Sequence, residues 1–354
     1  MSPFDRSHGP NGIWRNGDGN GTFAALDLGT NNCRLLIARP LDDGFRVIDA
    51  FSRIVRLGEG LSATGHLSEA AMERTIDALK VCAGKMRRRS VTHARSVATE
   101  ACRRAGNCNS FVGRVREETG IEIEIISTGE EAQLAFKGCA PLLDLARSRA
   151  LAFDIGGGST ELGWLALGPG RAPELRAWLS IPIGVVTLSE RYGSARVPPD
   201  VYESMVEEVA ALLRPFEAAY GIAAEIAAGA VQMIGSSGTV TTLAGIHLGL
   251  ARYDRRVVDG CDLDFSEIRA VSRSLAAMSC DERADNACVG RERADLVVAG
   301  CAILEAICSL WPVGRVRVAD RGVREGILLG LMHSVATAAG GRRAGAGPGG
   351  RSHP

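Results

Sequence analysis

The chain has 354 residues, 46% of them hydrophobic, so it can bury either one large core or two ordinary ones. Its 41 lysines and arginines balance 41 aspartates and glutamates, which excludes a global field that would recruit nucleic acid or a membrane surface. Any polyanion must therefore be bound by a local site.

The two ends of the chain have compositions that disfavour order. Residues 1–21 are rich in Gly, Asn and Asp, and residues 336–354 are rich in Gly and Arg, so both are predicted to be disordered tails. The start lacks the apolar stretch of a signal peptide, and no segment reaches the roughly 18 to 20 consecutive apolar residues of a membrane span. The ten cysteines form no CxxC pair. These features predict a cytoplasmic protein with buried thiols, no zinc site and no membrane contact.

Residues 22–145 are predicted to form a first lobe of alternating strands and helices. The opening TFAALDLGTNNCRLLIARP predicts two strands around a tight polar turn. Ser68 begins a helix whose apolar residues recur at helical spacing. The expected strands are 23–26, 33–38, 45–57, 95–99 and 122–126, and the expected helices are 68–88, 109–119 and 130–137.

Residues 146–335 are predicted to form a second lobe on the same plan. The segment LAFDIGGGSTELGWLAL repeats the strand, aspartate, polar turn and strand of the opening, with Asp154 in the place of Asp27. Such a duplication indicates two similar lobes that face each other across a cleft, which is the natural ligand site. Residues 251–290 are charged and irregular, and no role is predicted for them. The other expected elements are strands 161–167, 175–184, 232–235 and 315–320, and helices 201–220, 295–310 and 323–332.

The turns of the duplicated unit carry residue types that suit phosphate and a hydrated cation. Asp27 precedes the small residues Gly29, Thr30 and Asn31, whose backbone N–H groups are exposed, although an ordinary hairpin turn also explains this pattern. After Asp154, the glycines let phosphate oxygens approach the main chain closely. The carboxylates of Asp154 and Glu161 can hold Mg2+ through water. No P-loop or Rossmann motif occurs.

Three further motifs stand at the ends of predicted strands. Glu130 and Glu131 open a helix, where the dipole favours acidic residues, but a carboxylate there can also orient a water for attack on phosphorus. Arg103 can grip phosphate bidentately or simply lie at the surface. The segment 235–239, GSSGT, lies between a strand and a helix, so its amides either bind a phosphate or sugar or merely cap the helix.

These five motifs, in this order, resemble the exopolyphosphatase/guanosine-pentaphosphatase (Ppx/GppA) family of the actin/hexokinase/Hsp70 superfamily over residues 22–333. The segments that carry the resemblance are ALDLGTNN, VATEACRRAGN, EIISTGEEAQLAF, FDIGGGSTELG, GSSGTVTTLAG and VREGILLGL. The resemblance implies an α/β fold of two actin-like, ribonuclease H-like lobes of mixed sheet flanked by helices. It also implies an Mg2+-dependent phosphohydrolase that releases orthophosphate from polyphosphate or converts pppGpp to ppGpp.

The same resemblance implies a role for each motif. Glu131 positions the attacking water, and Arg103 binds phosphate. Asp154 and Glu161 organise Mg2+, and Asp27 completes the acidic wall. The phosphate turns are implied to be Gly29, Thr30 and Asn31 in one lobe and Gly156, Gly157, Gly158 and Ser159 in the other, and the nucleotide-facing segment to be Gly235, Ser236, Ser237, Gly238 and Thr239. A homodimer is also plausible by resemblance.

The chain departs from the family pattern in two places. Thr30 and Asn32 stand where serines are usual, and the chain ends soon after VREGILLGL, without the further helical region of long family members. This predicts a preference for short polyphosphate chains or a nucleotide. Two alternatives stay open: a kinase or ATPase of the same superfamily, and a sensor that binds (p)ppGpp or polyphosphate without turnover. The presence of all three acidic residues of the reaction, Glu131, Asp154 and Glu161, disfavours the sensor.

Overall fold

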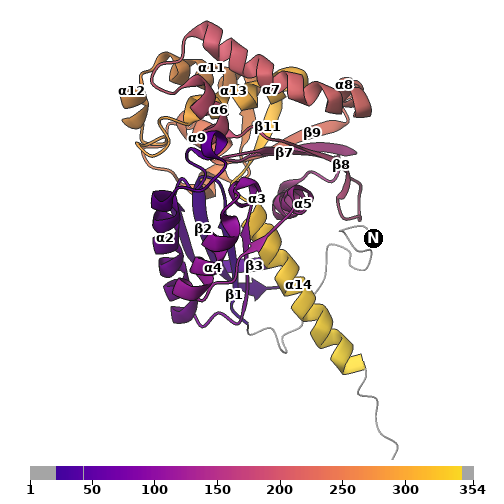
Figure 1. Cartoon of the computed structure of the whole chain (residues 1–354). Helices are drawn as coiled ribbons and strands as arrows, with labels where there is room; N and C mark the ends of the chain where they lie inside the picture. Colours follow the sequence, from indigo (N-terminus) through magenta and orange to yellow (C-terminus); the bar gives the residue numbers. More distant parts are fainter. Residues whose placement is uncertain (1–20, 43, 345–354) are drawn as a thin grey trace, which may run out of the picture.

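The computed structural model describes residues 21–42 and 44–344, which form two lobes (Figure 1). The first lobe contains the strands β1 (Phe23–Leu28), β2 (Asn32–Leu41), β3 (Gly44–Ile54), β4 (His93–Ala98) and β5 (Glu124–Ile125). Its helices are α1 (Leu61–Thr64), α2 (Glu69–Arg88), α3 (Glu100–Arg104) and α4 (Cys108–Thr119). The helix α5 (Thr128–Cys139) and the 3-10 turn η1 (Ala140–Leu142) lead to the second lobe.

The second lobe contains a larger sheet and more helices. Its strands are β6 (Arg149–Ile155), β7 (Thr160–Ala166), β8 (Glu174–Ile181), β9 (Val231–Ser236), β10 (Asp262–Asp264) and β11 (Arg315–Ala319). Its helices are α6 (Val185–Tyr192), α7 (Pro199–Tyr220), α8 (Ile222–Ala227), α9 (Gly238–His247), α10 (Arg255–Val258), α11 (Phe265–Ala277), α12 (Cys280–Ala284), α13 (Val297–Leu310) and α14 (Val323–Ala344). Among the described residues, no helix is long and apolar enough to cross a bilayer.

The two sheets share one strand order. The first runs β3-β2-β1-β4-β5, and the second contains the corresponding order β8-β7-β6-β9-β11 with β10 added at its edge. In each lobe the first two strands pair antiparallel, and the first strand pairs parallel with a later one. The connecting turns are closed by the same hydrogen bond, from Gly29 N to Asn32 O and from Gly156 N to Ser159 O, both 2.9 Å long. The predicted duplication is therefore confirmed.

Local sequence explains how the elements near the cleft begin. Ser68 caps α2 by accepting a hydrogen bond from Ala71 N, and the buried face of α2 has the predicted helical spacing. Ser127 caps α5 in the same way by accepting from Glu130 N, which places Glu131 in the first helical turn. The cap thus fixes the position of a candidate catalytic side chain.

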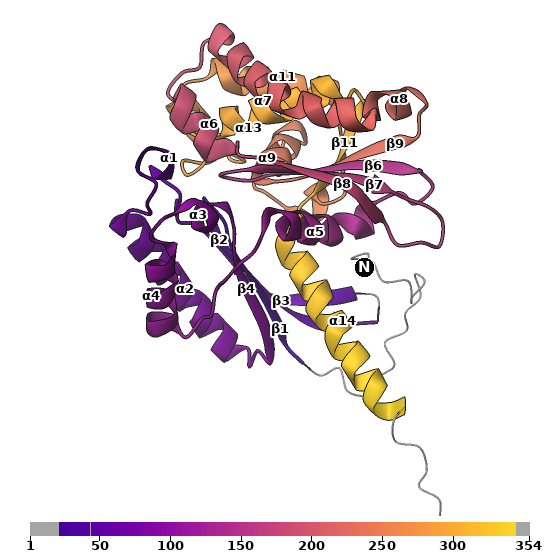
Figure 2. The same cartoon turned by 45° about the vertical axis from the view of Figure 1, so that its right-hand side comes forward.

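Helices α5 and α14 lie between the two sheets and join the lobes (Figure 2). In sequence α5 follows the first lobe but packs on β6, β7 and β8, whereas α14 follows β11 and packs on β1 and β2. The helices cross at two glycines. A Cβ at Gly138 would lie 2.1 Å from Gly322 O, and one at Gly326 would lie 2.0 Å from Leu134 O. The lobes are therefore joined by backbone contacts that no larger residue permits.

Three parts of the sequence-based prediction differ from the structure. Residues 251–290 are not irregular but form α10, β10, α11 and α12. Helix α11 buries only Ile268, Ser272 and Leu275, so its few apolar positions hide its period. The strand predicted at 122–126 shrinks to two residues at the sheet edge, and α14 continues to Ala344, beyond the predicted lobe boundary at 335. Of the predicted tails, residues 1–20 and 345–354 lie outside the described residues, whereas residues 336–344, predicted to be disordered, belong to the helix α14.

Candidate active site

A cleft with a volume of about 950 Å³, which is partly open to solvent, lies between the lobes. Both glycine turns line it, together with three of the predicted acidic residues and the start of α9. The predicted residues that line it are Asp27, Gly29, Thr30, Asn31, Glu131, Asp154, Gly156, Gly157, Gly158, Ser159, Ser237, Gly238 and Thr239. The structure therefore brings most of the predicted site into one place.

The turn of the first lobe presents N–H groups to the cleft because its carbonyl groups are held elsewhere. Thr30 O accepts a hydrogen bond from Gly58 N, and Asn31 O accepts from Val55 N and Arg56 N. The N–H groups of Thr30 and Asn31 make no hydrogen bond within residues 21–42 and 44–344. A turn whose carbonyl groups already accept hydrogen bonds and whose N–H groups are free is suited to bind an anion.

The turn of the second lobe has the same construction. Gly156 O accepts from Val185 N, and Gly157 O accepts from Val186 N, both at the start of α6. In the described part of the chain, the N–H groups of Gly157 and Gly158 make no hydrogen bond. Glycine is also favoured sterically, because a Cβ at Gly158 would lie 2.7 Å from Thr30 Oγ1 and one at Gly157 would lie 3.1 Å from Asn31 N. The two anion-binding turns thus lie directly against each other.

Five helices begin at the cleft. The first residues of α3, α6, α9, α13 and α14 all line it: Glu100, Val185, Gly238, Val297 and Val323. Each helix N-terminus carries a partial positive charge, which favours an anion nearby, although the first N–H groups of α6 are already donated to the triglycine turn. Ser237 caps α9 by accepting from Val240 N at 3.0 Å. The electrostatic field at the cleft therefore favours a multiply charged anion such as a phosphate chain.

Buried carboxylates make up the opposite charge of the site. Burial, together with repulsion from Glu161, raises the pKa of Glu131 to about 8. Burial also raises the pKa of Asp154 to about 7 and that of Glu161 to about 7. The pKa of Asp27 is raised for the same reason. Four acids that resist ionisation side by side indicate negative charge that a cation would relieve.

The carboxylates do not form a preassembled metal cage. Within residues 21–42 and 44–344, no three His, Cys, Asp or Glu side chains are placed to hold a metal ion together. Glu161 lies behind the cleft wall, and its Oε1 accepts from Ser159 Oγ at 2.7 Å and from Ser180 Oγ at 2.9 Å. Asp27 and Asp154 do line the cleft. Mg2+ usually keeps several waters and takes one or two carboxylates plus substrate phosphates, a donor set that these two residues fit.

Arg103 contacts two glutamates and does not line the cleft in this structure. Its Nη2 and Nε donate to Glu100 Oε2 at 2.8 and 3.1 Å, and its Nη1 donates to Ile126 O at 3.0 Å. The same Nη1 lies 2.8 Å from Glu131 Oε2 as an ion pair. Arg103 is thus placed to orient Glu131, and its predicted contact with phosphate stays a prediction.

Two arginines that the sequence analysis did not single out line the cleft. Neither Arg34 nor Arg293 forms an ion pair with a carboxylate among the described residues; the charge of Arg34 opposes the rise in the pKa of Asp27 and Asp154, and Arg293 Nη1 donates to Thr242 Oγ1 at 3.4 Å. Arg34 stands opposite Asp27 on the paired strand, as Glu161 stands opposite Asp154. Aligning the two repeats residue by residue reveals this position. Arg293 lies in an irregular loop, where no local pattern marks it.

The segment predicted to face a nucleotide divides into a part packed in the sheet and a part that lines the cleft. A Cβ at Gly235 would lie 2.4 Å from the ring of Phe153, so Gly235 belongs to the packed sheet. Ser236 is also buried and donates from Oγ to Arg321 O at 2.6 Å. Neither residue lines the cleft, in contrast to Ser237 and the two residues that follow.

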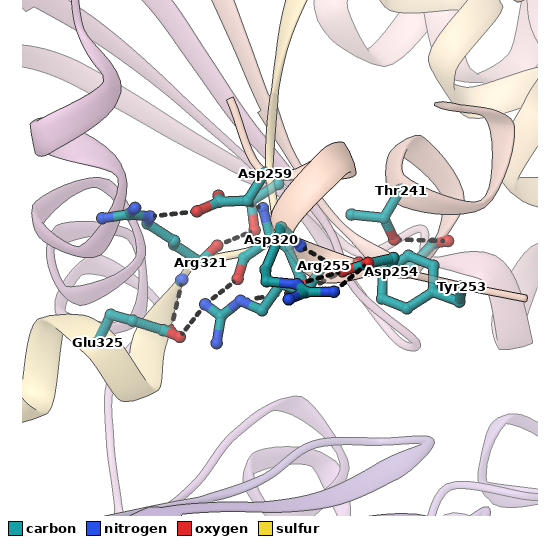
Figure 3. Close-up of polar contacts among 12 residues, drawn as sticks. Thr241, Tyr253, Asp254, Arg255, Asp259, Asp320, Arg321 and Glu325 are labelled. Carbon is teal, nitrogen blue, oxygen red and sulfur yellow. Dashed lines mark hydrogen bonds and ion pairs between the residues drawn. The ribbon is translucent and has the colours of Figure 1, made fainter. Parts of the chain in front are cut away.

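A polar network behind the cleft fixes the junction of β11 and α14 (Figure 3). Arg255 Nη2 donates to Glu325 Oε1 at 2.9 Å, and Arg321 Nε donates to Asp259 Oδ2 at 2.8 Å. Tyr253 Oη donates to Asp320 Oδ2 at 2.7 Å. This network gives residues 253–259 a structural role, because it fixes the position of Arg321. The carbonyl of Arg321 accepts the hydrogen bond from Ser236, which lies on β9 beside Asp154.

Comparison with known proteins identifies a matching family and solved structures with the same fold. The family model of Ppx/GppA phosphatases matches residues 36–335. An exopolyphosphatase from Cytophaga hutchinsonii is 26% identical with a TM-score of 0.79, covering 88% of this chain and 98% of that one. The PPX-GPPA enzyme of Aquifex aeolicus is 29% identical with a TM-score of 0.72, covering 88% of this chain and 99% of that one. The expected fold of two actin-like lobes of mixed sheet flanked by helices is confirmed.

Proposed function

Because the chain belongs to the Ppx/GppA phosphatase family, we propose that it is an Mg2+-dependent phosphohydrolase that releases terminal orthophosphate from polyphosphate. Conversion of pppGpp to ppGpp is a second activity of the same site. Water is the nucleophile, and Glu131 positions it. The similarity to exopolyphosphatases supports the reaction class, and the cleft supports the roles of the residues.

One observation carries the proposal, and it concerns Glu131. Its Oε2 is enclosed in the protein and accepts no hydrogen bond from any described residue, although the Arg103 guanidinium lies 2.8 Å away. The carboxylate faces the cleft beside the two turns that present free N–H groups. A buried carboxylate oxygen that is ion-paired but accepts no well-aligned hydrogen bond can still accept one from a ligand or water. An attacking water is a donor of the required kind.

Different residues of the cleft have different roles in an in-line displacement at phosphorus. The N–H groups of Thr30, Asn31, Gly157 and Gly158 hold the oxygens of the terminal phosphoryl group. Glu131 accepts a hydrogen bond from the water and takes its proton, while Arg103 fixes the orientation of the carboxylate. Phosphoryl transfer needs mainly such positioning and charge stabilisation. Mg2+, held by Asp27 and Asp154 with Glu161 behind them, would neutralise phosphate oxygens when bound.

The charge of the acidic residues links cation binding to catalysis. Glu131 must be ionised to accept a proton, yet burial and repulsion raise its pKa to about 8. Asp154 and Glu161 contribute to this negative environment. When a bound cation neutralises them, the pKa of Glu131 falls and the base becomes ionised near neutral pH. Activity is therefore expected to rise with pH and to require a divalent cation.

The lining of the second lobe favours pppGpp as the second substrate. Apolar residues, among them Val185, Leu296 and Val297, line the same cleft as Ser237 and Gly238. Apolar side chains beside the N-terminus of a helix can accept a base and sugar next to a phosphate chain. The bond cleaved is a terminal phosphoanhydride in both substrates, so the same turns and the same base serve them.

Release of orthophosphate tests the proposal. Purified protein with Mg2+ is given short polyphosphate, long polyphosphate, pppGpp or ATP, and Glu131→Gln is compared with Glu130→Gln. Glu130 is a matched control because it neighbours Glu131, pairs with Arg95 at 2.6 Å and does not line the cleft. We expect release that Glu131→Gln abolishes and Glu130→Gln retains. Turnover of ATP alone would indicate a superfamily kinase or ATPase, and tight binding without release would indicate a sensor.

A further inference from the structure

An ion pair joins the two lobes at the end of the cleft that is farther from the crossing of α5 and α14. Arg56 Nη1 contacts Asp295 Oδ2 at 2.6 Å, and its Nη2 contacts Asp295 Oδ1 at 3.1 Å. Nη2 also donates to Glu292 O at 3.3 Å. Arg56 follows β3 in the first lobe, and Asp295 precedes α13 in the second. Such a bidentate pair fixes both distance and orientation.

A second bond reinforces this connection nearby. Gly60 N donates to Glu190 Oε1 at 2.9 Å, which joins the loop before α1 to α6 of the second lobe. Figure 2 shows α1 next to α6 at this end of the molecule. The residue before Glu190, Ser189, donates from Oγ to Asp295 O at 2.8 Å. The two interlobe bonds therefore converge on one corner formed by α6 and the loop that carries Asp295.

Each partner of the pair is connected to the phosphate site. The backbone N–H of Arg56 donates to Asn31 O at 3.0 Å, so the residue that reaches across the cleft also pins the first turn. Asp295 lies between Arg293 and Leu296, which both line the cleft. Helix α6, which Ser189 links to Asp295, holds the carbonyls of the triglycine turn. The residues of this corner are thus directly connected to both phosphate turns.

The backbone of Arg56 supports a specific role for its side chain. Its φ is +48°, and Arg56 and Ser90 are the two non-glycine residues with positive φ in the described part of the chain. This left-handed conformation is unfavourable for a residue with a Cβ, and it persists only where the surrounding structure holds it. Here it directs the guanidinium across the cleft. A glycine would adopt the same backbone without strain.

We propose that Arg56 and Asp295 form a closure latch that holds the lobes together over the substrate and positions the Thr30–Asn31 turn and Arg293 for the reaction. The pair acts through other residues and does not touch the reacting atoms. Its side chains are 34% and 26% exposed, so they can separate into water when the lobes open. The kinetic part of this proposal rests on the proposed phosphohydrolase function, whereas the conformational part does not.

The test compares variants that remove the latch with a matched control. Arg56→Gly removes the guanidinium and permits φ near +48°, and Asp295→Asn removes the charge from the other side. Arg114→Ala is the control, because Arg114 is 33% exposed and forms its ion pairs with Glu69 and Glu118 inside the first lobe. Small-angle X-ray scattering of the purified proteins measures lobe opening. We expect a larger radius of gyration for both latch variants, with an unchanged melting temperature, and a wild-type radius for the control.

Kinetics gives a second, independent readout. We expect KM for short polyphosphate to rise about tenfold in Arg56→Gly, a size expected for one charge-assisted contact, while kcat changes less. Arg56→Lys keeps one charge and should recover part of the affinity. If Arg56→Gly keeps both the wild-type radius and the wild-type KM, the latch is refuted. If the variants open but no protein releases phosphate, the proposed function fails and the latch stands.

Discussion

Glu161 offers a prediction in which a catalytic requirement opposes stability. Its side chain is 2% exposed, and burial raises its pKa from 4.5 to about 7, with Asp154 adding repulsion and Ser159 and Ser180 opposing the shift. Because its pKa is higher in the folded state, ionisation of Glu161 destabilises the fold. The cost is absent below pH 4.5, grows between pH 4.5 and 7, and is complete above pH 7. The protein without divalent cation should therefore lose stability as the pH rises through this window.

The substitution Glu161→Gln removes this cost and keeps the shape of the side chain. A shift of about 2.5 pKa units corresponds to about 3 kcal/mol, so the variant should be more stable than wild type by about 3 kcal/mol at pH 8. At pH 4 the two proteins should be equally stable. The measurement is denaturant unfolding in EDTA across this pH range. Added Mg2+ should narrow the difference at pH 8, because a ligand of the folded state stabilises wild type.

Two outcomes would refute this reasoning. If Glu161→Gln is less stable than wild type at pH 8 without cation, the hydrogen bonds from Ser159 and Ser180 outweigh the cost of burying the charge. If the difference does not depend on pH, Glu161 has no raised pKa. Glu174→Gln provides the control, because Glu174 is a glutamate at the start of the edge strand β8 whose side chain is 47% exposed.

Three further substitutions test other parts of the account. Glu131→Gln should lower kcat by about 100-fold or more with little change in KM, because it removes the base and not the phosphate contacts. Gly326→Ala should destabilise the protein by about 3 kcal/mol in denaturant unfolding, because its Cβ would meet Leu134 O. Gly330→Ala in the same helix should be neutral, because the atom nearest to its Cβ is 3.7 Å away. Arg293→Met should raise KM about tenfold without a change in melting temperature, because it removes a charge-assisted phosphate contact. The same substitution at the exposed neighbouring residue, Arg291→Met, should change neither quantity.

Each of these predictions has a contradicting result. Wild-type turnover in Glu131→Gln would remove this residue from the mechanism. Equal stability of Gly326→Ala and Gly330→Ala would show that α5 and α14 separate freely, so that their crossing does not join the lobes. An unchanged KM in Arg293→Met would show that substrate binds elsewhere in the cleft.

The sequence was sufficient to predict those features that local patterns encode. The repeated unit around Asp27 and Asp154 predicted two related lobes, because strand periodicity and glycine turns are local properties. The acidic pair Glu130 and Glu131 predicted the start of a helix after a strand, and the structure has Glu131 in the first turn of α5 at the cleft. A residue-by-residue alignment of the two repeats would also have identified Arg34. It stands opposite Asp27 on the paired strand, as Glu161 stands opposite Asp154.

Other features depend on packing that a local pattern does not contain. The apolar spacing of α5 predicts a helix, but its placement on the opposite lobe depends on the crossing at Gly138 and Gly326. The contacts of Arg103 with Glu100 and Glu131 require the strand that carries Ile126 to lie beside α3. The ion pair of Arg56 with Asp295 joins residues far apart in the chain. These contacts emerge only when both lobes are assembled.

The most direct test of the central claim is the fate of solvent oxygen during turnover. The protein is incubated with Mg2+ and short polyphosphate in water enriched in oxygen-18, and the released orthophosphate is analysed by mass spectrometry. If Glu131 directs water at the terminal phosphorus, the released orthophosphate carries one solvent oxygen, and Glu131→Gln yields almost none. Release of unlabelled orthophosphate, or transfer of the phosphoryl group to a nucleotide, would contradict hydrolysis at this site.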